Sequence, residues 1–311
     1  MIKKDKVKKS KYVNGDPDEK FQKSTLLKML IFLGPFMIGI VIFTLYPFIN
    51  AFLMSFKEGY SILTDSFKNW GLGNYERVLG DKNFRSAFVN TLRYVVIVIP
   101  ITMALSIVIA VLLNNTKRFK ALLQTAYFLP LVTSTAAISL VFKFIFQDSY
   151  GLINQLLKMM GMSTIKFLSS KYWSKIVLYI FAVWNNMPFT IILLLAGLQN
   201  IDPQYYTAAK VDGAKPLDIF FNITLPLLAP TIALTLIINS ISAFKVFDLV
   251  YQLIGDTNNA RALGHYTLIY YVYAQMQNFK YGYAAAAAIV LFAIIAVFTG
   301  IQNFIQKKWN Y

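Results

Sequence analysis

The feature that most constrains this chain is a set of long stretches without Asp, Glu, Lys or Arg. They are Met29–Phe56, Tyr94–Thr116, Ala121–Phe142, Ile176–Ile201, Ile219–Phe244 and Tyr281–Gln306. Each is at least about as long as the ~20 residues that a helix needs to cross the hydrocarbon layer of a membrane. The whole chain is 57% hydrophobic and 14% charged, whereas soluble domains carry about 25% charged residues. These features predict an integral membrane protein.

The same runs predict the fold class. Lipid offers the backbone no hydrogen-bond partners, so only helices or a closed barrel can cross it. Runs that are apolar throughout lack the alternation of a barrel strand. We therefore predict an all-α membrane protein with six transmembrane helices. Their expected bounds are 29–56, 94–116, 121–142, 176–199, 223–248 and 281–306. Another uncharged run, Ala262–Phe279, contains His265, amides and tyrosines, and this polarity favours an interfacial segment.

The basic residues predict the orientation. Six spans place both ends of the chain on one side, together with the second and fourth loops. That side carries most of the Lys and Arg residues, with many of them in Lys3–Lys28. The positive-inside rule then puts both termini in the cytoplasm. We expect residues 1–28 to form a basic cytoplasmic tail and residues 29–311 the transmembrane domain. Part of the net charge of +16 then reflects the orientation of the chain in the membrane. We therefore expect no nucleic-acid partner.

The first apolar run is too long for the core of about 7–15 residues in a signal peptide, so we expect it to remain in the membrane. The residues of catalytic and metal sites are scarce. The chain has one histidine and no cysteine, and it lacks HExxH, GxSxG and Walker-type motifs. Acidic residues are nearly absent from the predicted spans, which disfavours a proton relay or an ion-driven carrier. We predict a non-catalytic protein without a metal site that depends on a partner for energy.

A compact polar segment, TAAKVDGAKPLDIFFNITLP, separates the fourth and fifth predicted spans. Just before it, Asp202 and Pro203 fit the N-cap and first position of a helix. Gly213 fits the left-handed position after a helix end. We expect one short helix over 203–212 and another beginning at Pro216. The small Ala208 and Ala209 would let a partner approach closely, although a helix hairpin without a partner fits as well.

This segment resembles the EAA loop of ATP-binding-cassette (ABC) importer permeases. That pattern is Glu-Ala-Ala, three residues, Gly, nine residues and Ile-x-Leu-Pro. The matching residues are Ala208, Ala209, Gly213, Ile223, Leu225 and Pro226. Thr207 replaces the family's Glu. The stretches NYERVLGDKNFRSAFVNTLRY, FKVFDLVYQLIGD and YGYAAAAAIVLF resemble sugar-type permeases, relatives of the larger maltose permease subunit.

The resemblance implies a subunit of an importer in the bacterial cell (inner) membrane. Its loop 202–222 would be the coupling helix that sits in a cleft of a cytosolic ATPase. The implied coupling residues are Tyr206, Thr207, Ala208, Ala209, Asp212, Gly213 and Ala214. The implied partners are a second permease subunit, two ABC ATPase subunits, an external solute-binding protein and the lipid bilayer. ATP and Mg would be bound by the ATPase, so no cofactor is expected in this chain.

Two stretches are candidates for contact with the solute. VWNNMPF places two amides beside Pro188 in the middle of the fourth span. Buried amides are costly in lipid unless they meet a partner or a wet cavity, so they either contact solute or hold helices together. In the fifth span, a helix with 100° per residue places Asn239, Ser242, Ala243 and Val246 on one face. The resemblance implies sugar contacts in both stretches. The candidates are Asn185, Asn186, Phe189, Asn239, Ser242, Ala243 and Val246.

Other interpretations remain. Lys245 and Asp248 have the spacing of an ion pair on a helix surface, although a role in a gate or as a solute ligand is also open. The alternative solute for such a permease is glycerol phosphate, which requires a cation facing the path. A different class, an ATP-independent channel or ion-coupled carrier, predicts transport without ATPase subunits. An intramembrane enzyme is disfavoured because nucleophile–base pairs are lacking.

Overall fold

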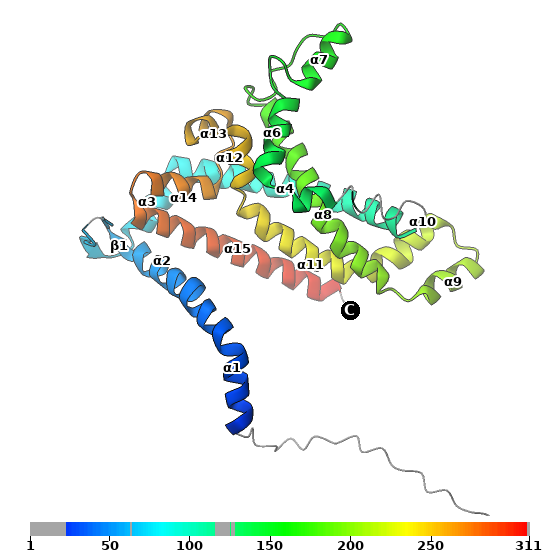
Figure 1. Ribbon diagram of the computed structural model, residues 1–311, viewed down its shortest axis with the longest axis horizontal. Helices are drawn as coiled ribbons and strands as arrows, with labels where there is room; N and C mark the ends of the chain where they lie inside the picture. Colours follow the sequence, from blue (N-terminus) through cyan, green and yellow to red (C-terminus); the bar gives the residue numbers. More distant parts are fainter. Residues whose placement is uncertain (1–22, 63, 116–124, 126–127, 310–311) are drawn as a thin grey trace, which may run out of the picture. The chain divides into compact units, whose positions relative to one another are not determined.

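The computed structural model describes residues 23–309, except residues 63, 116–124 and 126–127 (Figure 1). The chain divides into two compact units, Met1–Ala51 and Phe52–Tyr311. In the first unit, α1 (Lys23–Ile40) continues through a single π-helical segment, η1 (Val41–Leu45), into α2 (Tyr46–Phe56). Most of the large apolar side chains from Met29 to Leu45 are exposed, as expected for a helix whose surroundings are lipid.

The second unit is built on four long helices: α4 (Lys82–Asn115), α8 (Trp173–Gln199), α11 (Leu225–Phe244) and α15 (Tyr281–Trp309). α4 packs along α8, and α11 packs against α4, α8 and α15 (Figure 1). Large apolar side chains such as Phe181 and Leu228 are fully buried between them. A polar contact adds to this packing, because Gln302 Nε2 of α15 donates to Ser240 Oγ of α11 at 2.9 Å.

Short elements gather at the end of the unit where α4, α8 and α15 begin and α11 ends (Figure 1). A small antiparallel sheet pairs β1 (Lys57–Glu58) with β2 (Asn69–Trp70). The short helices there are α3 (Gly73–Gly80), α6 (Thr135–Ile145), α7 (Leu152–Met159), α12 (Asp248–Ile254), α13 (Thr257–Leu263) and α14 (Leu268–Gln277). At the other end, α8 is followed by α9 (Pro203–Val211), α10 (Pro216–Ile219) and the π-helical η2 (Phe220–Thr224).

Among the described residues, 5 helices are long and apolar enough to cross a membrane. They are Lys28–Phe56, Lys82–Asn115, Trp173–Gln199, Pro216–Phe244 and Tyr281–Lys307. Each of them overlaps one of the predicted spans, and one predicted span has no counterpart among them. The predicted span 121–142 falls partly on residues 121–124 and 126–127, outside the described part. The rest of it includes α6, which is too short to cross alone. A sixth span therefore stays a prediction.

Both ends of the fifth span, expected over 223–248, differ from the prediction. The helical stretch begins at Pro216, because Lys215 N donates to Asp218 Oδ2 and caps the first turn there. It ends at Phe244, where Lys245 adopts a non-helical φ and ψ of −95° and 14°. Asp248 then begins α12. The chain therefore leaves the helix four residues before the predicted end, and this break shapes the site described below.

The uncharged run Ala262–Phe279 is not one of the long candidate spans. Within it, α14 packs against α15 and α4, and Tyr270 and Tyr271 are fully buried. Tyr271 OH donates to Asp81 Oδ2 at 2.9 Å. The tyrosine-rich composition, which predicted an interfacial segment, thus reflects packing against two long helices as well.

Candidate functional site

A polar cavity of about 200 Å³ lies beside the end of α11. Its lining residues are Tyr94, Thr135, Asn185, Asn186, Ser242, Ala243, Lys245, Val246, Phe247, Asp248 and Leu249. They come from α4, α6, α8, α11 and α12, and from the non-helical residues 245–247 between α11 and α12. The break in the helix at Phe244 is what turns this segment into the cavity wall.

On the α8 side, two neighbouring amides are held differently. Pro188 has no N–H to donate to the carbonyl of Trp184, and it lies inside α8 next to this pair. Asn186 Nδ2 donates to Ala182 O at 2.8 Å, so its amide is partly used within the helix. The Asn185 side chain has no hydrogen bond to the described part of the chain. Its amide is therefore available to a hydroxyl-bearing solute in the cavity.

On the α11 side, Asn239 has a structural contact. Its Nδ2 donates to Thr190 Oγ1 of α8 at 3.0 Å, and both side chains are buried. Asn239 does not line the large cavity, but it shares a second hollow of about 10 Å³ with Asn186 and Ala243. This hydrogen bond ties α8 to α11. Asn239 therefore has the helix-holding role that the sequence suggested as an alternative for Asn185 and Asn186.

The structure brings five of the predicted solute-contact residues to the large cavity: Asn185, Asn186, Ser242, Ala243 and Val246. Phe189 lines neither hollow, and 38% of its surface is exposed. It follows Asn185 by four residues and Asn186 by three, so it shares their face of α8 about one turn further along the helix. Contact of any of these residues with a solute stays a prediction.

The expected ion pair between Lys245 and Asp248 is absent from the described part of the chain. The expectation assumed one continuous helix, in which residues three apart lie on one face. Instead, Lys245 follows the last residue of α11 and Asp248 is the first residue of α12. Both line the cavity. The cavity is thus lined by one positively charged side chain, Lys245, and one negatively charged side chain, Asp248.

The loop after α8 has the caps that the sequence predicted. Asp202 Oδ1 accepts from Gln204 N at 2.9 Å, and Pro203 is the first residue of α9. The helix ends at Val211, and Gly213 has a φ of +74°, which L side chains adopt only with strain. The helix predicted over 203–212 is found over Pro203–Val211, one residue shorter, and the predicted helix start at Pro216 is confirmed.

The surface of this loop is open and partly apolar. Val211 is 83% exposed, and Tyr205, Leu217 and Phe221 are exposed as well. Of the predicted coupling residues, Thr207, Ala208, Asp212 and Gly213 are exposed, Tyr206 and Ala214 are half-buried, and Ala209 is buried. Exposed apolar groups clustered among polar ones are typical of a protein contact surface. Figure 1 shows α9 and α10 beyond the end of α8.

Thr207 cannot take over the role of a glutamate in this loop. Its Oγ1 donates back to Pro203 O at 3.1 Å, so the hydroxyl is used within α9. A threonine also has no charge with which to bind a basic partner. Among the described residues, moreover, no three or more His, Cys, Asp or Glu side chains come together as a metal site.

Sequence reasoning missed several lining residues, including Tyr94, Thr135 and Phe247. Tyr94 follows Arg93 directly, and such a polar start to an apolar run could have suggested it. Thr135 had no such signal, because α6 reaches the cavity through its packing against α12. Phe247 was hidden by the expectation that the helix continues past Phe244.

Residues 76–311 match the family described as binding-protein-dependent transport system inner membrane component. The lactose transport system permease protein LacF of Rhizobium radiobacter is 32% identical over 283 residues, covering 89% of this chain and 93% of LacF. The arabinooligosaccharides transport system permease protein AraP of Bacillus subtilis is 33% identical over 270 residues, covering 86% and 84%. The trehalose/maltose transport system permease protein MalF of Thermococcus litoralis is 29% identical over 265 residues, covering 85% and 88%.

Two crystal structures share the fold. One is a bacterial alginate ABC transporter in complex with an alginate pentasaccharide-bound periplasmic protein. Its matching chain has a TM-score of 0.81 and 22% identity, with 93% of this chain and 98% of that chain covered. The other is a bacterial ABC transporter involved in alginate import, with a TM-score of 0.78 and 23% identity, covering 93% and 97%. At these identities the likeness concerns the fold.

Proposed function

The chain belongs to the family of binding-protein-dependent transport system inner membrane components, and on this premise we propose that it is a permease subunit of an ATP-driven importer for a sugar or oligosaccharide. It forms half of the translocation path and catalyses no reaction itself. A partner ATPase binds and hydrolyses ATP. LacF, AraP and MalF, which align with most of this chain, are named for the transport of sugars.

The observation that carries the proposal is the polar cavity between α8 and the end of α11. Its amides from Asn185 and Asn186 and the hydroxyl of Ser242 are groups that can donate to and accept from sugar hydroxyls. Phe247 and Tyr94 add aromatic rings that suit the apolar faces of a sugar ring. Such groups are costly inside a membrane unless they serve a solute or a wet path.

The coupling loop supports energy supply from a partner. α8 carries Asn185 and Asn186 and leads directly into α9, while the helix that starts at Pro216 ends at the other cavity wall. A push on α9 would therefore reach both walls through two stiff helices. We infer that ATPase subunits bind the exposed surface of α9 and drive alternating access to the cavity.

The remaining assembly follows from the same premise. A sixth span lies over 121–142, and both termini face the cytoplasm, on the side of α9. A second permease subunit encloses the path with this chain, two ABC ATPases bind on the cytoplasmic side, and an external solute-binding protein delivers the sugar. This assembly is inferred from three features of the sequence: the uncharged runs, the distribution of basic residues and the EAA-like loop.

A permease for a phosphorylated solute such as glycerol phosphate is the second candidate within the family. It needs a cation facing the path, and Lys245 does line the cavity. Asp248 lines the same cavity, however, so the two charges offset each other. This balance favours a neutral solute over an anion.

A matched pair of glycine variants tests the proposal. Gly213 after α9 and Gly161 after α7 both have a φ of +74°, and a Cβ at either would meet nothing within 4 Å. Gly213→Asp and Gly161→Asp therefore carry the same backbone strain and the same added charge. In the reconstituted complex, we expect Gly213→Asp to abolish solute-stimulated ATP hydrolysis and Gly161→Asp to retain it. Equal stimulation in both variants would contradict coupling through α9, and uptake without ATPase subunits would favour a channel or carrier.

A further inference from the structure

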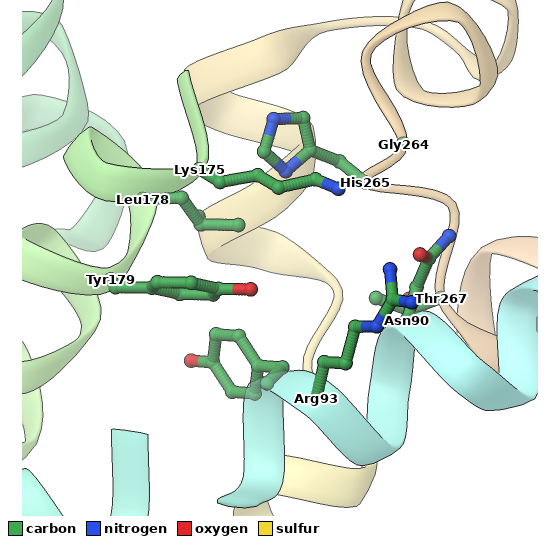
Figure 2. Close-up of a pocket in the computed structure, with 9 residues that line it drawn as sticks. Asn90, Arg93, Lys175, Leu178, Tyr179, Gly264, His265 and Thr267 are labelled. Carbon is green, nitrogen blue, oxygen red and sulfur yellow. The ribbon is translucent and has the colours of Figure 1, made fainter. Parts of the chain in front are cut away.

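A further small hollow, distinct from the two described above, lies between α4, α8 and the loop that joins α13 to α14 (Figure 2). Its volume is about 10 Å³, enough for about one water-sized group. Figure 2 shows Lys175 from α8 and Arg93 from α4 reaching toward the loop with Gly264 and His265. It is separate in position from the proposed solute cavity, apart from sharing Tyr94.

Positive charge gathers at this hollow without a counter-charge. A Cβ on Gly264 would lie 3.1 Å from Lys175 Nζ and 3.3 Å from Lys171 Cε, so both lysines lie against this glycine. Arg93 lines the same hollow. None of its lining residues is Asp or Glu, and no ion pair of these three cations occurs in the described part of the chain. Like charges held together in this way repel each other unless an anion joins them.

The histidine of the hollow does not supply a charge. His265 is buried, and its Nε2 lies 2.8 Å from Ser174 Oγ. Burial, together with the nearby charge of Lys175, lowers the pKa of His265 to about 4. The imidazole is therefore neutral near pH 7. The charge of the cluster comes from Arg93, Lys171 and Lys175.

The level of the cluster along α8 indicates what the anion is. α8 begins at Trp173, which makes an edge-to-face contact with Tyr172 at 5.4 Å, and Tyr172 is 68% exposed. Trp and Tyr concentrate at the membrane–water interface. Lys171 and Lys175 flank these two rings, so they stand at the depth of the lipid headgroups. Basic pockets between transmembrane helices bind anionic headgroups on the cytoplasmic side of membranes, and this cluster would bind a headgroup by the same chemistry at the opposite side, where α8 begins.

We propose that Arg93, Lys171 and Lys175 bind the phosphate of an anionic membrane lipid, with one phosphate oxygen entering the hollow. Arg93 and Lys171 are exposed and contact the headgroup from the rim, while the half-buried Lys175 reaches the oxygen inside. Free inorganic phosphate has the same chemistry. The aromatic residues beside the cluster favour the lipid, because they place it where lipid phosphates are concentrated.

The test measures thermal unfolding of the purified chain in detergent, titrated with phosphatidylglycerol or with inorganic phosphate. We expect phosphatidylglycerol to raise the unfolding temperature and inorganic phosphate at the same concentration to have little effect. The double variant Arg93→Gln/Lys175→Gln should bind the lipid roughly 30-fold more weakly, because each basic residue contributes about 1 kcal/mol of headgroup attraction and about 1.4 kcal/mol is a factor of ten in affinity. Lys158→Gln, which removes an exposed lysine of α7, is the control and should bind as wild type does.

Each other outcome overturns the proposal. Equal shifts with both ligands, both lost in the double variant, would indicate a free-anion site. An unchanged lipid affinity in the double variant would place lipid binding elsewhere, and a shift only with a solute-binding protein would make the cluster a protein contact. If the double variant fails to fold, Lys171→Gln and the charge-retaining Lys175→Arg replace it. We expect the first to weaken binding and the second to preserve it, and the reverse would refute the assignment.

Discussion

The contact between α8 and α11 depends on one glycine. A Cβ at Gly197 would lie 2.5 Å from Thr231 Oγ1 and 2.8 Å from both Thr231 Cγ2 and Leu228 Cδ1, whereas ordinary contacts are 3.4–4 Å. Leu228 is fully buried, so it has little room to move. Gly197→Ala must therefore separate the two helices by roughly 1 Å at this crossing, where a small residue lets helices pack closely.

The magnitude follows from two opposing effects. Replacing Gly by Ala inside a helix gains about 1 kcal/mol in helix propensity. Overpacking a closely packed contact costs about 1–3 kcal/mol. Gly300 in α15 is the matched control, because a Cβ there meets nothing within 4 Å. Gly300→Ala keeps only the gain, so the two variants should differ in free energy of unfolding by about 1–3 kcal/mol.

The assay is thermal unfolding of both purified variants in the same detergent, with solute affinity measured in parallel. We expect Gly197→Ala to unfold at a lower temperature than Gly300→Ala. We also expect it to bind solute more weakly, because α8 and α11 form two walls of the cavity. Equal stabilisation by both alanines would refute the packing of α8 on α11 at Gly197.

Three further results are expected. Asp202→Ala removes the N-cap of α9, at a cost of about 1 kcal/mol to that helix. It should lower solute-stimulated ATP hydrolysis without changing solute affinity. A changed solute affinity with normal stimulation of hydrolysis would contradict this. Asn185→Ala should weaken solute binding without lowering the unfolding temperature. Asn239→Ala loses its hydrogen bond to Thr190 and should cost about 1 kcal/mol of stability. The opposite pattern would mean that Asn239 contacts the solute and Asn185 stabilises the helix packing. Because burial lowers the pKa of His265 to about 4, the unfolded chain binds a proton below pH ~6.5 that the folded chain excludes. Stability should therefore be complete above pH ~6.5 and fall by about 2 kcal/mol by pH 5, and pH titration of His265→Gln should show a flatter curve; an unchanged curve would refute the neutral histidine.

The sequence predicted those features that depend on local chemistry. Uncharged runs marked the long helices, since lipid or a helical core excludes charge along the whole run. The caps of α9 were predictable because Asp202, Pro203 and Gly213 act within a few residues of themselves. The ends of long helices were less predictable. α4 begins at Lys82, well before the uncharged run starts at Tyr94, because a helix can continue into water beyond its apolar part.

The features that the sequence did not predict depend on packing between distant elements. Lys245 and Asp248 have helical spacing, but the contacts of α12 end the helix between them. Thr135 reaches the cavity only because α6 packs on α12. Arg93 and Lys175 meet because α4 and α8 pack along each other. No pattern within a single segment contains that information.

The central claim is that α9 carries motion from an ATPase to the cavity walls. The chain contains no cysteine, so one introduced thiol gives an unambiguous cross-link. Val211→Cys in α9 and the control Met159→Cys in α7 start from side chains that are 83% and 82% exposed. In membranes that contain the assembled transporter, we predict that the thiol at residue 211 cross-links to the ATPase with a yield that changes when ATP is added, and that the thiol at 159 does not. No ATPase adduct at 211, while ATP-dependent uptake continues, would contradict the account.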